Sequence, residues 1–546
     1  MFDRIKKAIS WKLKVSQQVY IQLFTFLNLA LYGGPFFKYF LNSKPFVPEF
    51  VFYLLVPLSY LVSMVLLNTI FAIILHGRSI KIVSSLILMA NSLCLYLMNT
   101  HRIQINSLTI ANLFRMDLRL LKDFFSLKLA AQMLYRGLLP TLFITIKVRI
   151  KSEPGDWAAN IGFGSVSMLI IVLILGPGLY FPSSRTFLLK RNAYTLNYLL
   201  PVNYMGSTAY FCGTRIKNIF SRYKSKTIDR EAKIKGKILG NGKKNLIVLV
   251  IGSSARSQNF SLNGYKRKTN KSLEKLGILS YKNVSSCGTS AAHSIPCIFS
   301  YLSRKEFKPL EKAKYRNLLD ILRDVGFDVL WRSNAGSCLG LCKRDEYLST
   351  TGLAEDGLDE SLIVTLNEDF KKLKKQNTII VLNQRGSQEP LYKRYPKNFE
   401  KFTPSCRSGL GQCSLAELVN SYDNSIYYSS YNLSKILDIL KIRASDHNIM
   451  LLYVSDHGFG LGENDRWGHS MAYRDAGQYV TRVPMLMWFS NGFKQVFRID
   501  ENCLRKKLNS RLSHDNIFHS LLGLFNVESG HYSKSLDIFG SCRIIK

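Results

Sequence analysis

Long apolar runs before Pro182 constrain the fold of this chain more than any other feature of its sequence. Five segments stand out, covering residues 19–41, 46–75, 80–98, 127–150 and 159–181. Each is close to the roughly 20 residues that an α-helix needs to cross the hydrocarbon core of a bilayer. The fourth is weaker because it contains Arg136. We expect a transmembrane domain of five helices over residues 1–182. A cleavable signal peptide is the poorer interpretation, because the apolar segments continue.

Basic residues beside these segments predict their orientation, since lysine and arginine are enriched in cytoplasmic loops. They occur at the N-terminus and in the two loops expected on the same side: Arg4, Lys6, Lys7, Lys12 and Lys14, then Arg78 and Lys81, then Lys147, Arg149 and Lys151. We therefore expect a cytoplasmic N-terminus and an exported chain after residue 181. This describes a multi-pass membrane protein whose C-terminal domain lies outside the cytoplasm.

Two further segments are expected to lie at the membrane surface or to lead away from it. Residues 99–124 carry apolar side chains at helical spacing, which predicts an amphipathic surface helix. Residues 183–242 form the expected linker. Its part before Asn203 is apolar and aromatic enough to lie on the membrane, and the stretch 215–243 is rich in lysine and arginine.

The formal net charge of +37 has two readings. Drift toward lysine codons explains it as well as attraction to an anionic surface does. Nucleic acid is not expected as a partner, because no nucleic-acid-binding motif is present and the apolar segments point to a membrane.

Cysteines gather in the second half of the chain, where eight of the ten lie between Cys287 and Cys542. An even, clustered set in an exported domain indicates disulfides. The expected pairs are Cys287 with Cys297, Cys338 with Cys342, Cys406 with Cys413, and Cys503 with Cys542. Zinc binding by Cys338 and Cys342 is the alternative, and no second pair of that kind supports it. Cys94 and Cys212 are expected to be unpaired.

From residue 243 onward, short apolar runs alternate with amphipathic helices, which is the pattern of an α/β domain. Strands are expected at 245–252, 327–331, 378–382, 448–454 and 484–489. Helices are expected at 309–325, 360–375, 416–442 and 514–524. In such domains the chemistry lies in loops at the carboxyl ends of parallel strands. We expect residues 243–546 to carry a site at that edge.

Six short motifs in this half carry a family resemblance. They read QNFSLNGY at 258–265, CGTSAAHSIPCIFS at 287–300, GSQEPLYKRYP at 386–396, SDHGFGLGEN at 455–464, HDNIFHSLL at 514–522 and LDIFGSCR at 536–543. Together with the apolar segments they closely resemble the lipid A phosphoethanolamine transferases. The resemblance implies a multi-pass protein of a bacterial inner membrane, with a sulfatase-like, alkaline-phosphatase-like soluble domain in the periplasm. It also implies a double displacement: a zinc-activated threonine takes phosphoethanolamine from phosphatidylethanolamine and passes it to lipid A or to the lipopolysaccharide core.

Several site residues that the resemblance implies are replaced in this chain. The zinc-binding glutamate after the first strand is Ser253, and the nucleophile position is Ala291, which has no hydroxyl. The histidine of the family's GSHGP motif is Gln388, followed by Glu389 in place of glycine. The lysine near the phosphate is Leu339.

The external loop departs as well. Asn112 matches a family asparagine, but Met116 and Leu120 stand where the family has threonine and glutamate.

Three of the site residues that the resemblance implies are retained in this chain. Asp456 and His457 match metal ligands, and His469 matches a substrate-side or second-metal histidine. A tight zinc site normally has three or four protein ligands. We therefore expect zinc, the cofactor of the family, to bind weakly or not at all.

Three interpretations remain open. The chain is a phosphoethanolamine transferase homologue whose chemistry is impaired or lost, a pseudoenzyme in the latter case. Alternatively, it is a non-catalytic envelope protein that binds lipopolysaccharide or a partner transferase. The third interpretation is an active transferase with a shifted nucleophile, for which Thr289 and Ser290 are the candidates. A hydroxyl at these positions can instead cap the helix expected to begin near residue 291.

Overall fold

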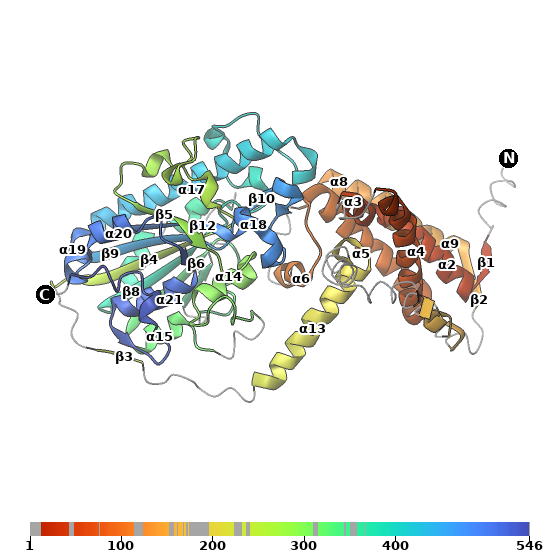
Figure 1. Cartoon of the computed structure of the whole chain (residues 1–546), viewed down its shortest axis with the longest axis horizontal. Helices are drawn as coiled ribbons and strands as arrows, with labels where there is room; N and C mark the ends of the chain where they lie inside the picture. The colour runs from red at the N-terminus through yellow and green to blue at the C-terminus, as the bar shows by residue number, and fades with distance from the viewer. Residues whose placement is uncertain are drawn as a thin grey trace. The chain divides into compact units, whose positions relative to one another are not determined.

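The computed structural model describes residues 12–42, 49–75, 77–113, 124–151, 158–160, 162–166, 169–170, 173, 196–222, 232–235, 241–309, 315–342, 346–349, 357–364 and 366–544. The chain forms two compact units, and Figure 1 displays the elements of both. The first unit comprises Met1–Ile110 and Phe125–Phe211, and the second comprises Ala111–Phe124 and Cys212–Lys546.

The first unit is helical. Its main elements are α2 (Gln17–Tyr32), α3 (Gly34–Asn42), α4 (Glu49–Ile74), α5 (Ile80–His101), α8 (Leu127–Gln132), the π-helical turn η2 (Met133–Leu138) and α9 (Leu139–Lys147). Within the described residues, three stretches have the length and composition to cross a membrane: Pro57–Ile74, Ile80–His101 and Leu127–Lys147. These correspond to the second, third and fourth expected segments.

The first and fifth expected segments have different outcomes. The helix expected at 19–41 is divided at Gly33 into α2 and α3. Pro35 follows directly and cannot donate the backbone hydrogen bond that a continuous helix would need. The segment expected at 159–181 lies mostly outside the described residues.

The fourth segment ends earlier than expected, because Val148–Lys151 forms strand β2 and pairs in parallel with β1 (Leu13–Ser16). Its arginine is accommodated by the end of α2. Arg136 Nη1 donates a 3.0 Å hydrogen bond to the carbonyl oxygen of Leu31. The Tyr32 hydroxyl in turn donates to the Arg136 carbonyl. The positive charge thus lies at the negative end of a helix dipole, a favourable place for it in an apolar segment.

The connecting segments are more ordered than the sequence indicates. The described part of the expected surface helix is α6 (Ser107–Leu113). Helix α13 (Val202–Arg222) continues into the region expected to be a basic linker. Further along, β3 (Lys233–Ile234) pairs antiparallel with β14 (Val527–Glu528).

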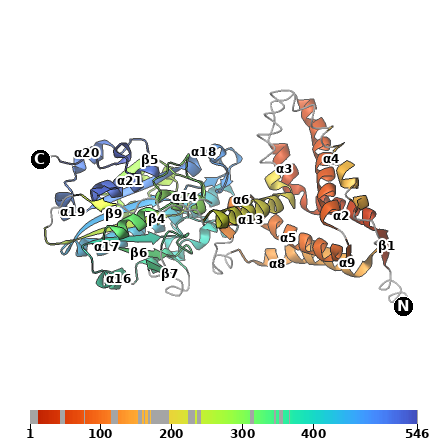
Figure 2. The ribbon, with the colours of Figure 1, turned by 90° about the horizontal axis from the view of Figure 1, so that it is seen from below.

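An eight-stranded sheet organises the second unit, in the order β13-β5-β12-β9-β4-β8-β6-β7. Figure 2 labels its strands β4, β5, β6, β7 and β9 among the helices of this unit. The five expected strands are present as β4 (Lys244–Gly252), β6 (Phe327–Ser333), β8 (Asn377–Asn383), β9 (His447–Ser455) and β12 (Arg482–Phe489). The sequence did not identify β5 (Leu279–Ser285), β7 (Tyr347–Ser349) and β13 (Leu512–Ser513). Strand β5 is interrupted by polar residues and so lacks a continuous apolar run, and the other two strands are very short.

Among the five expected strands, β12 differs in direction, because it pairs antiparallel with both β9 and β5. After β9 the chain stays at the carboxyl edge through α18 (Tyr473–Thr481), which leads directly into β12. With no crossover between them, β12 must run back in the opposite direction.

Helices cover both faces of the sheet. Along β4, Ile247, Leu249 and Ile251 pack into one core, which also holds residues of α15 and α21. The alternate residues of the same strand pack into a second core with α17. Period-two alternation on a strand buried on both faces produces this three-layer arrangement.

The expected helices vary in how well they match. Those at 416–442 and 514–524 are present as α17 (Leu415–Arg443) and α21 (Asp515–Leu524). The helix expected at 309–325 is the shorter α15 (Leu318–Asp324), because the side chain of Asn317 accepts hydrogen bonds from the amides of Leu319 and Asp320 and fixes the start there. The helix expected at 360–375 is split into a 3₁₀ turn (Asp359–Leu362) and α16 (Leu366–Lys372).

All four expected disulfides are present: Cys287–Cys297, Cys338–Cys342, Cys406–Cys413 and Cys503–Cys542. The alternative of zinc binding by Cys338 and Cys342 is therefore wrong for this state of the protein. Cys94 and Cys212 are free, as expected.

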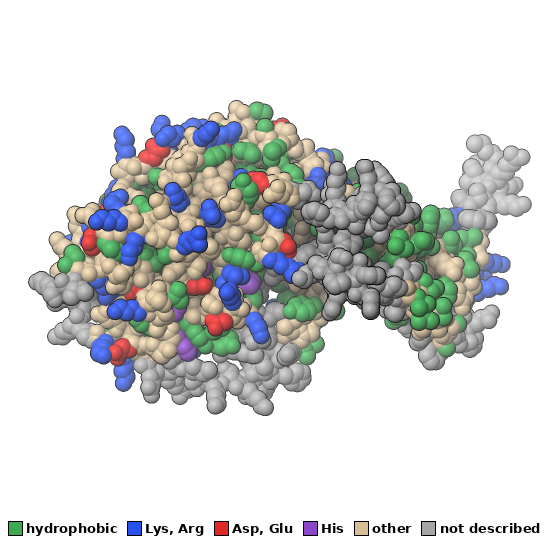
Figure 3. Space-filling view, in the orientation of Figure 1, with side chains coloured by type: hydrophobic (Ala, Val, Ile, Leu, Met, Phe, Trp, Pro, Cys, Tyr) green, Lys and Arg blue, Asp and Glu red, His purple; other side chains and the backbone are tan. Residues whose placement is uncertain are grey.

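Basic side chains are spread over the face of the second unit seen in Figure 3, interspersed with acidic and uncharged ones. On that face they do not gather into one patch. The high net charge therefore does not by itself locate a binding surface there.

Candidate active site at the carboxyl edge of the sheet

The parallel pairing of β4 with β9 creates the site. It places Gly252 opposite Ser455, so the chain continues from both strands at the same edge, into Ser253 and Asp456. The backbone amide of Asp456 donates a 2.9 Å hydrogen bond to the carbonyl oxygen of Gly252, which ties the two loops together.

Asp456 is the central charged group of the site and is fully buried. Its Oδ1 accepts hydrogen bonds from the amides of Ser254, at 3.0 Å, and His457, at 2.7 Å. Its Oδ2 accepts a longer bond, of 3.3 Å, from the hydroxyl of Ser253. Burial raises the pKa of Asp456 to about 7, because these hydrogen bonds only partly offset the loss of solvation.

His457 is oriented by its own backbone. Its Nδ1 lies 2.8 Å from the carbonyl oxygen of Gly458, to which it donates, and this leaves the lone pair of Nε2 free. The Nε2 atom lies 3.4 Å from Asp456 Oδ2. Burial lowers the pKa of His457 to about 4, so the ring is neutral near neutral pH.

His469 lies beside this pair. Its ring centroid is 4.5 Å from that of His457, and its Nδ1 is 2.7 Å from the hydroxyl oxygen of Ser470. Burial lowers the pKa of His469 well below the usual value, and the neighbouring His457 acts in the same direction.

Ala291 is the first residue of α14 (Ala291–Ile298). The expectation that a neighbouring hydroxyl caps this helix is wrong. Ser290 is the N-cap residue, but its side chain makes no capping hydrogen bond, and its buried hydroxyl has no partner among the described residues. The Thr289 hydroxyl donates to the Met471 carbonyl at 2.5 Å, so this hydroxyl is already engaged.

A cavity of about 60 Å³ unites these groups. It is lined by Ser253, Ala291, Ala292, Ile295, Ala335, Ser337, Leu339, Asn383, Gln384, Gln388, Asp456, His457 and His469. The structure therefore brings together the three positions that the resemblance marks as retained and four of the five that it marks as replaced in the soluble domain, since Glu389 is not among the lining residues. Asn112 lies in α6, and its side chain is outside the part that the structure describes, as are Met116 and Leu120.

The sequence did not single out Gln384, which follows β8. Its side chain is fully buried and lines the cavity, yet neither amide atom has a hydrogen-bond partner within the described part of the chain. The run of polar residues directly after a buried strand was the signal that could have identified it. No lysine or arginine is among the lining residues. The cavity thus offers hydrogen bonds, one carboxyl group and two neutral imidazoles.

Comparison with known proteins places this arrangement in a family. Residues 245–527 match the family model described as sulfatase, and residues 49–215 match the model described as phosphoethanolamine transferase EptA/EptB. Phosphoethanolamine transferase EptA of Escherichia coli K12 is 33% identical over 420 residues, which cover 75% of this chain and 76% of that protein. The EptA protein of Salmonella typhimurium is 32% identical over 476 residues, covering 85% and 86%.

Solved structures agree with these matches. The integral membrane lipooligosaccharide phosphoethanolamine transferase A from Neisseria meningitidis has a TM-score of 0.86 at 28% identity, over 97% of this chain and 99% of that one. The soluble domain of the Neisseria meningitidis protein alone has a TM-score of 0.55 at 35% identity, over 58% of this chain and 98% of that one. Both halves of the chain are therefore matched in sequence and in structure. This chain belongs to the family of phosphoethanolamine transferases with a membrane part and a sulfatase-like domain.

Proposed function

We propose that this chain is a phosphoethanolamine transferase homologue that has lost the covalent threonine route, so that it is catalytically impaired or a pseudoenzyme. One observation carries the proposal: Ala291 lines the same cavity as Asp456 and His457. This is the position that matches the family nucleophile. A methyl group cannot form a phosphate ester, whatever the surrounding groups do to pKa values or charge.

Metal binding is proposed to be weak for a reason of donor chemistry. Asp456 Oδ2 and His457 Nε2 are 3.4 Å apart, close to the separation of two ligands on one tetrahedral zinc with bonds of about 2.0 Å. Ser253 adds only a neutral hydroxyl, and Ala291 adds no donor atom. Zinc bound here would neutralise charge on a phosphoryl group. Two strong donors are fewer than the three or four of a tight site.

Phosphoryl binding is expected to be weak as well. A buried phosphate dianion needs a cation or a metal nearby, because its desolvation is otherwise uncompensated. Leu339 occupies the position that matches the family lysine, and the described residues that line the cavity include no lysine or arginine. Relatives are named as phosphoethanolamine transferases, and two of them as Kdo(2)-lipid A phosphoethanolamine transferases. By that relationship, phosphatidylethanolamine and lipid A or lipopolysaccharide are the molecules this chain would meet, in an inner membrane with the sulfatase-like domain in the periplasm.

Two alternatives each have an observation in their favour. The unpartnered amide of Gln384 favours a non-catalytic envelope protein that holds a polar ligand, such as part of a lipopolysaccharide, or that supports a partner transferase. The unpartnered hydroxyl of Ser290 favours an active transferase with a shifted nucleophile. Thr289 is the weaker of the two substitutes, because its hydroxyl is bonded to Met471.

The deciding experiment is a transfer assay with a fluorescent phosphatidylethanolamine donor and purified full-length protein. We expect negligible turnover by the natural chain and little gain from Ala291→Thr alone, since the metal ligands remain incomplete. The triple variant Ala291→Thr, Ser253→Glu, Gln388→His should turn over faster. Ala292→Thr, combined with the same two other changes, is the matched control, because Ala292 lines the cavity next to Ala291.

Metal content and adduct mapping separate the alternatives. Dialysed natural protein should contain far less than one zinc per chain, and the triple variant should retain more. Robust turnover by the natural chain, with a phosphoethanolamine adduct mapped to Ser290 or Thr289, would overturn the proposal and establish a moved nucleophile. Absent turnover together with specific retention of lipopolysaccharide would favour the binding role.

A further inference from the structure

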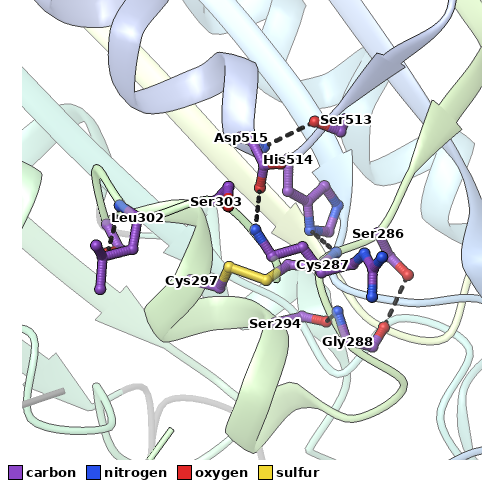
Figure 4. The surroundings of a disulfide bond; sticks show 12 residues. Ser286, Cys287, Gly288, Ser294, Cys297, Leu302, Ser303, Ser513, His514 and Asp515 are labelled. Carbon is purple, nitrogen blue, oxygen red and sulfur yellow. Dashed lines mark hydrogen bonds between the residues drawn. A yellow bond between two sulfur atoms is a disulfide. The ribbon is translucent and has the colours of Figure 1, made fainter. Parts of the chain in front are cut away.

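His514 is a fully buried histidine that lies outside the cavity lining, at the start of α21. It opens the motif HDNIFHSLL, to which the site described above gives no role. Figure 4 places its side chain beside Cys287, close to the disulfide with Cys297. The ring therefore lies outside the cavity, between the loop that ends at Ala291 and the loop that carries Asp456 and His457.

Each ring nitrogen forms a hydrogen bond with the backbone of one of these loops. Nδ1 accepts a 3.1 Å hydrogen bond from the backbone amide of Cys287. A ring nitrogen that accepts carries no proton, so in the neutral ring Nε2 carries it. Nε2 donates to the carbonyl oxygen of Ser455 at 3.0 Å. The arrangement fixes a single tautomer.

The two partners lie next to the groups that matter for chemistry. Cys287 opens the loop that ends at Ala291, and Ser455 directly precedes Asp456. Both bonds go to backbone atoms, so they do not depend on which side chains the loops carry.

The histidine is itself firmly held. Its amide donates a 3.0 Å hydrogen bond to the carbonyl oxygen of Ser285, and Ser513 pairs with the same residue across β13 and β5. On the other side of the loop, the disulfide joins Cys287 to Cys297 in α14. A fixed ring between two loops can therefore set the distance between them.

We propose that His514 is a positioning residue that holds the loop ending at Ala291 in register with the loop that carries Asp456 and His457. Neither of its bonds involves Ser253, Ala291, Leu339 or Gln388, the four cavity-lining positions at which the resemblance implies a different residue. The contact therefore preserves the shape of the cavity independently of a metal ion or a nucleophile. This inference does not depend on whether the chain is active.

Variants that mimic half of the ring can test the two bonds separately. An asparagine oxygen lies near the position of Nδ1, so His514→Asn can keep the Cys287 bond but does not reach Ser455. A glutamine nitrogen lies near the position of Nε2, so His514→Gln can keep the Ser455 bond. His514→Phe removes both bonds and retains the volume of a ring.

The readout is hydrogen–deuterium exchange of the full-length chain in detergent, measured on peptides covering 286–297 and 452–461. We expect His514→Phe to raise exchange about five- to tenfold in both peptides, the effect of losing about one hydrogen bond in each loop. His514→Asn should raise exchange mainly in the second peptide, and His514→Gln mainly in the first. Exchange in α17 should not change.

The matched control is His519, on the same helix and also buried. Its Nδ1 accepts a hydrogen bond from the amide of Ser533, at 3.1 Å, which lies in neither loop. His519→Phe should therefore raise exchange around residue 533 and leave both site loops protected. The proposal is overturned if His514→Phe leaves the loops protected or if His519→Phe opens them equally. Identical exchange patterns in the asparagine and glutamine variants would overturn it too, even if the phenylalanine variant does not fold.

Discussion

The hydroxyl of Tyr422 donates a 2.6 Å hydrogen bond to the carbonyl oxygen of Ser254. The hydroxyl oxygen of Tyr422 also accepts a 2.9 Å hydrogen bond from the backbone amide of Arg256. Ser254 has a φ of 60°, in the left-handed region that is unfavourable for most residues other than glycine. Helix α17 thus holds, from one face of the sheet, the strained turn that presents Ser253 to the cavity.

Removing this hydroxyl should destabilise the second unit. Tyr422→Phe leaves two buried backbone groups without a partner, and we expect a loss of about 2–4 kcal/mol in the free energy of unfolding. Pulse proteolysis in urea on the detergent-solubilised chain measures it. Tyr431→Phe, on the same helix but partly exposed, should change the free energy by less than about 0.5 kcal/mol. Equal effects of the two changes would contradict the role given to Tyr422.

Asp456 should make stability depend on pH. Burial holds its folded-state pKa at about 7, above the ordinary value of 3.8. The stability that the protonated group contributes is fully present below pH 3.8 and is lost as pH rises through about 7. Asp456→Asn lacks this titration. Its free energy of unfolding relative to the natural chain should therefore rise between pH 4 and pH 8, by on the order of 2–4 kcal/mol.

The measurement is urea unfolding of both proteins across this pH range, with a chelator present to keep the site free of metal. Both proteins contain His457, and because burial lowers its pKa to about 4, the folded-state ring is neutral over most of this range and adds little to the difference. Asp438→Asn, which removes an exposed carboxylate from α17, should give no comparable rise. A difference that stays flat with pH for Asp456→Asn would refute the prediction.

The disulfides should contribute in the order of the loops they close. The sequence separations are 4 for Cys338–Cys342, 10 for Cys287–Cys297 and 39 for Cys503–Cys542. Chain entropy then predicts losses of about 2, 3 and 4 kcal/mol when both cysteines of a pair are changed to alanine. Pulse proteolysis of the three double variants under the same conditions checks the order. A reversed order would mean that native-state contacts outweigh loop entropy here.

Topology can be tested with reporter fusions. The basic residues that flank the apolar segments predict that a phosphatase fused after Phe181 is exported and active, whereas one fused after Lys151 is silent. A fluorescent protein that matures only in the cytoplasm should give the opposite pattern at the same two sites. Activity at Lys151 with silence at Phe181 would invert the predicted orientation.

Much of the fold follows from local patterns in the sequence. The five strands that the sequence predicted are those with strong apolar runs, and α17 and α21 are where the amphipathic pattern places them. The three cysteine pairs with short sequence separations, of 4, 7 and 10, were predictable from spacing. These features depend on residues that are close in sequence, so the sequence alone determines them. The family resemblance likewise rests on contiguous motifs.

What the sequence left undecided depends on partners that are distant along the chain. Only folding shows that the Thr289 hydroxyl is engaged by Met471, and that His514 joins Cys287 to Ser455. The direction of β12 was likewise set by the position of α18, which keeps the chain at the carboxyl edge of the sheet until β12 begins. The apolar pattern of a strand does not indicate the direction in which it runs. A hydroxyl or an imidazole can donate or accept almost anywhere. The tertiary structure fixes its role by bringing particular backbone groups within about 3 Å of it. Those groups lie in loops that are distant along the chain.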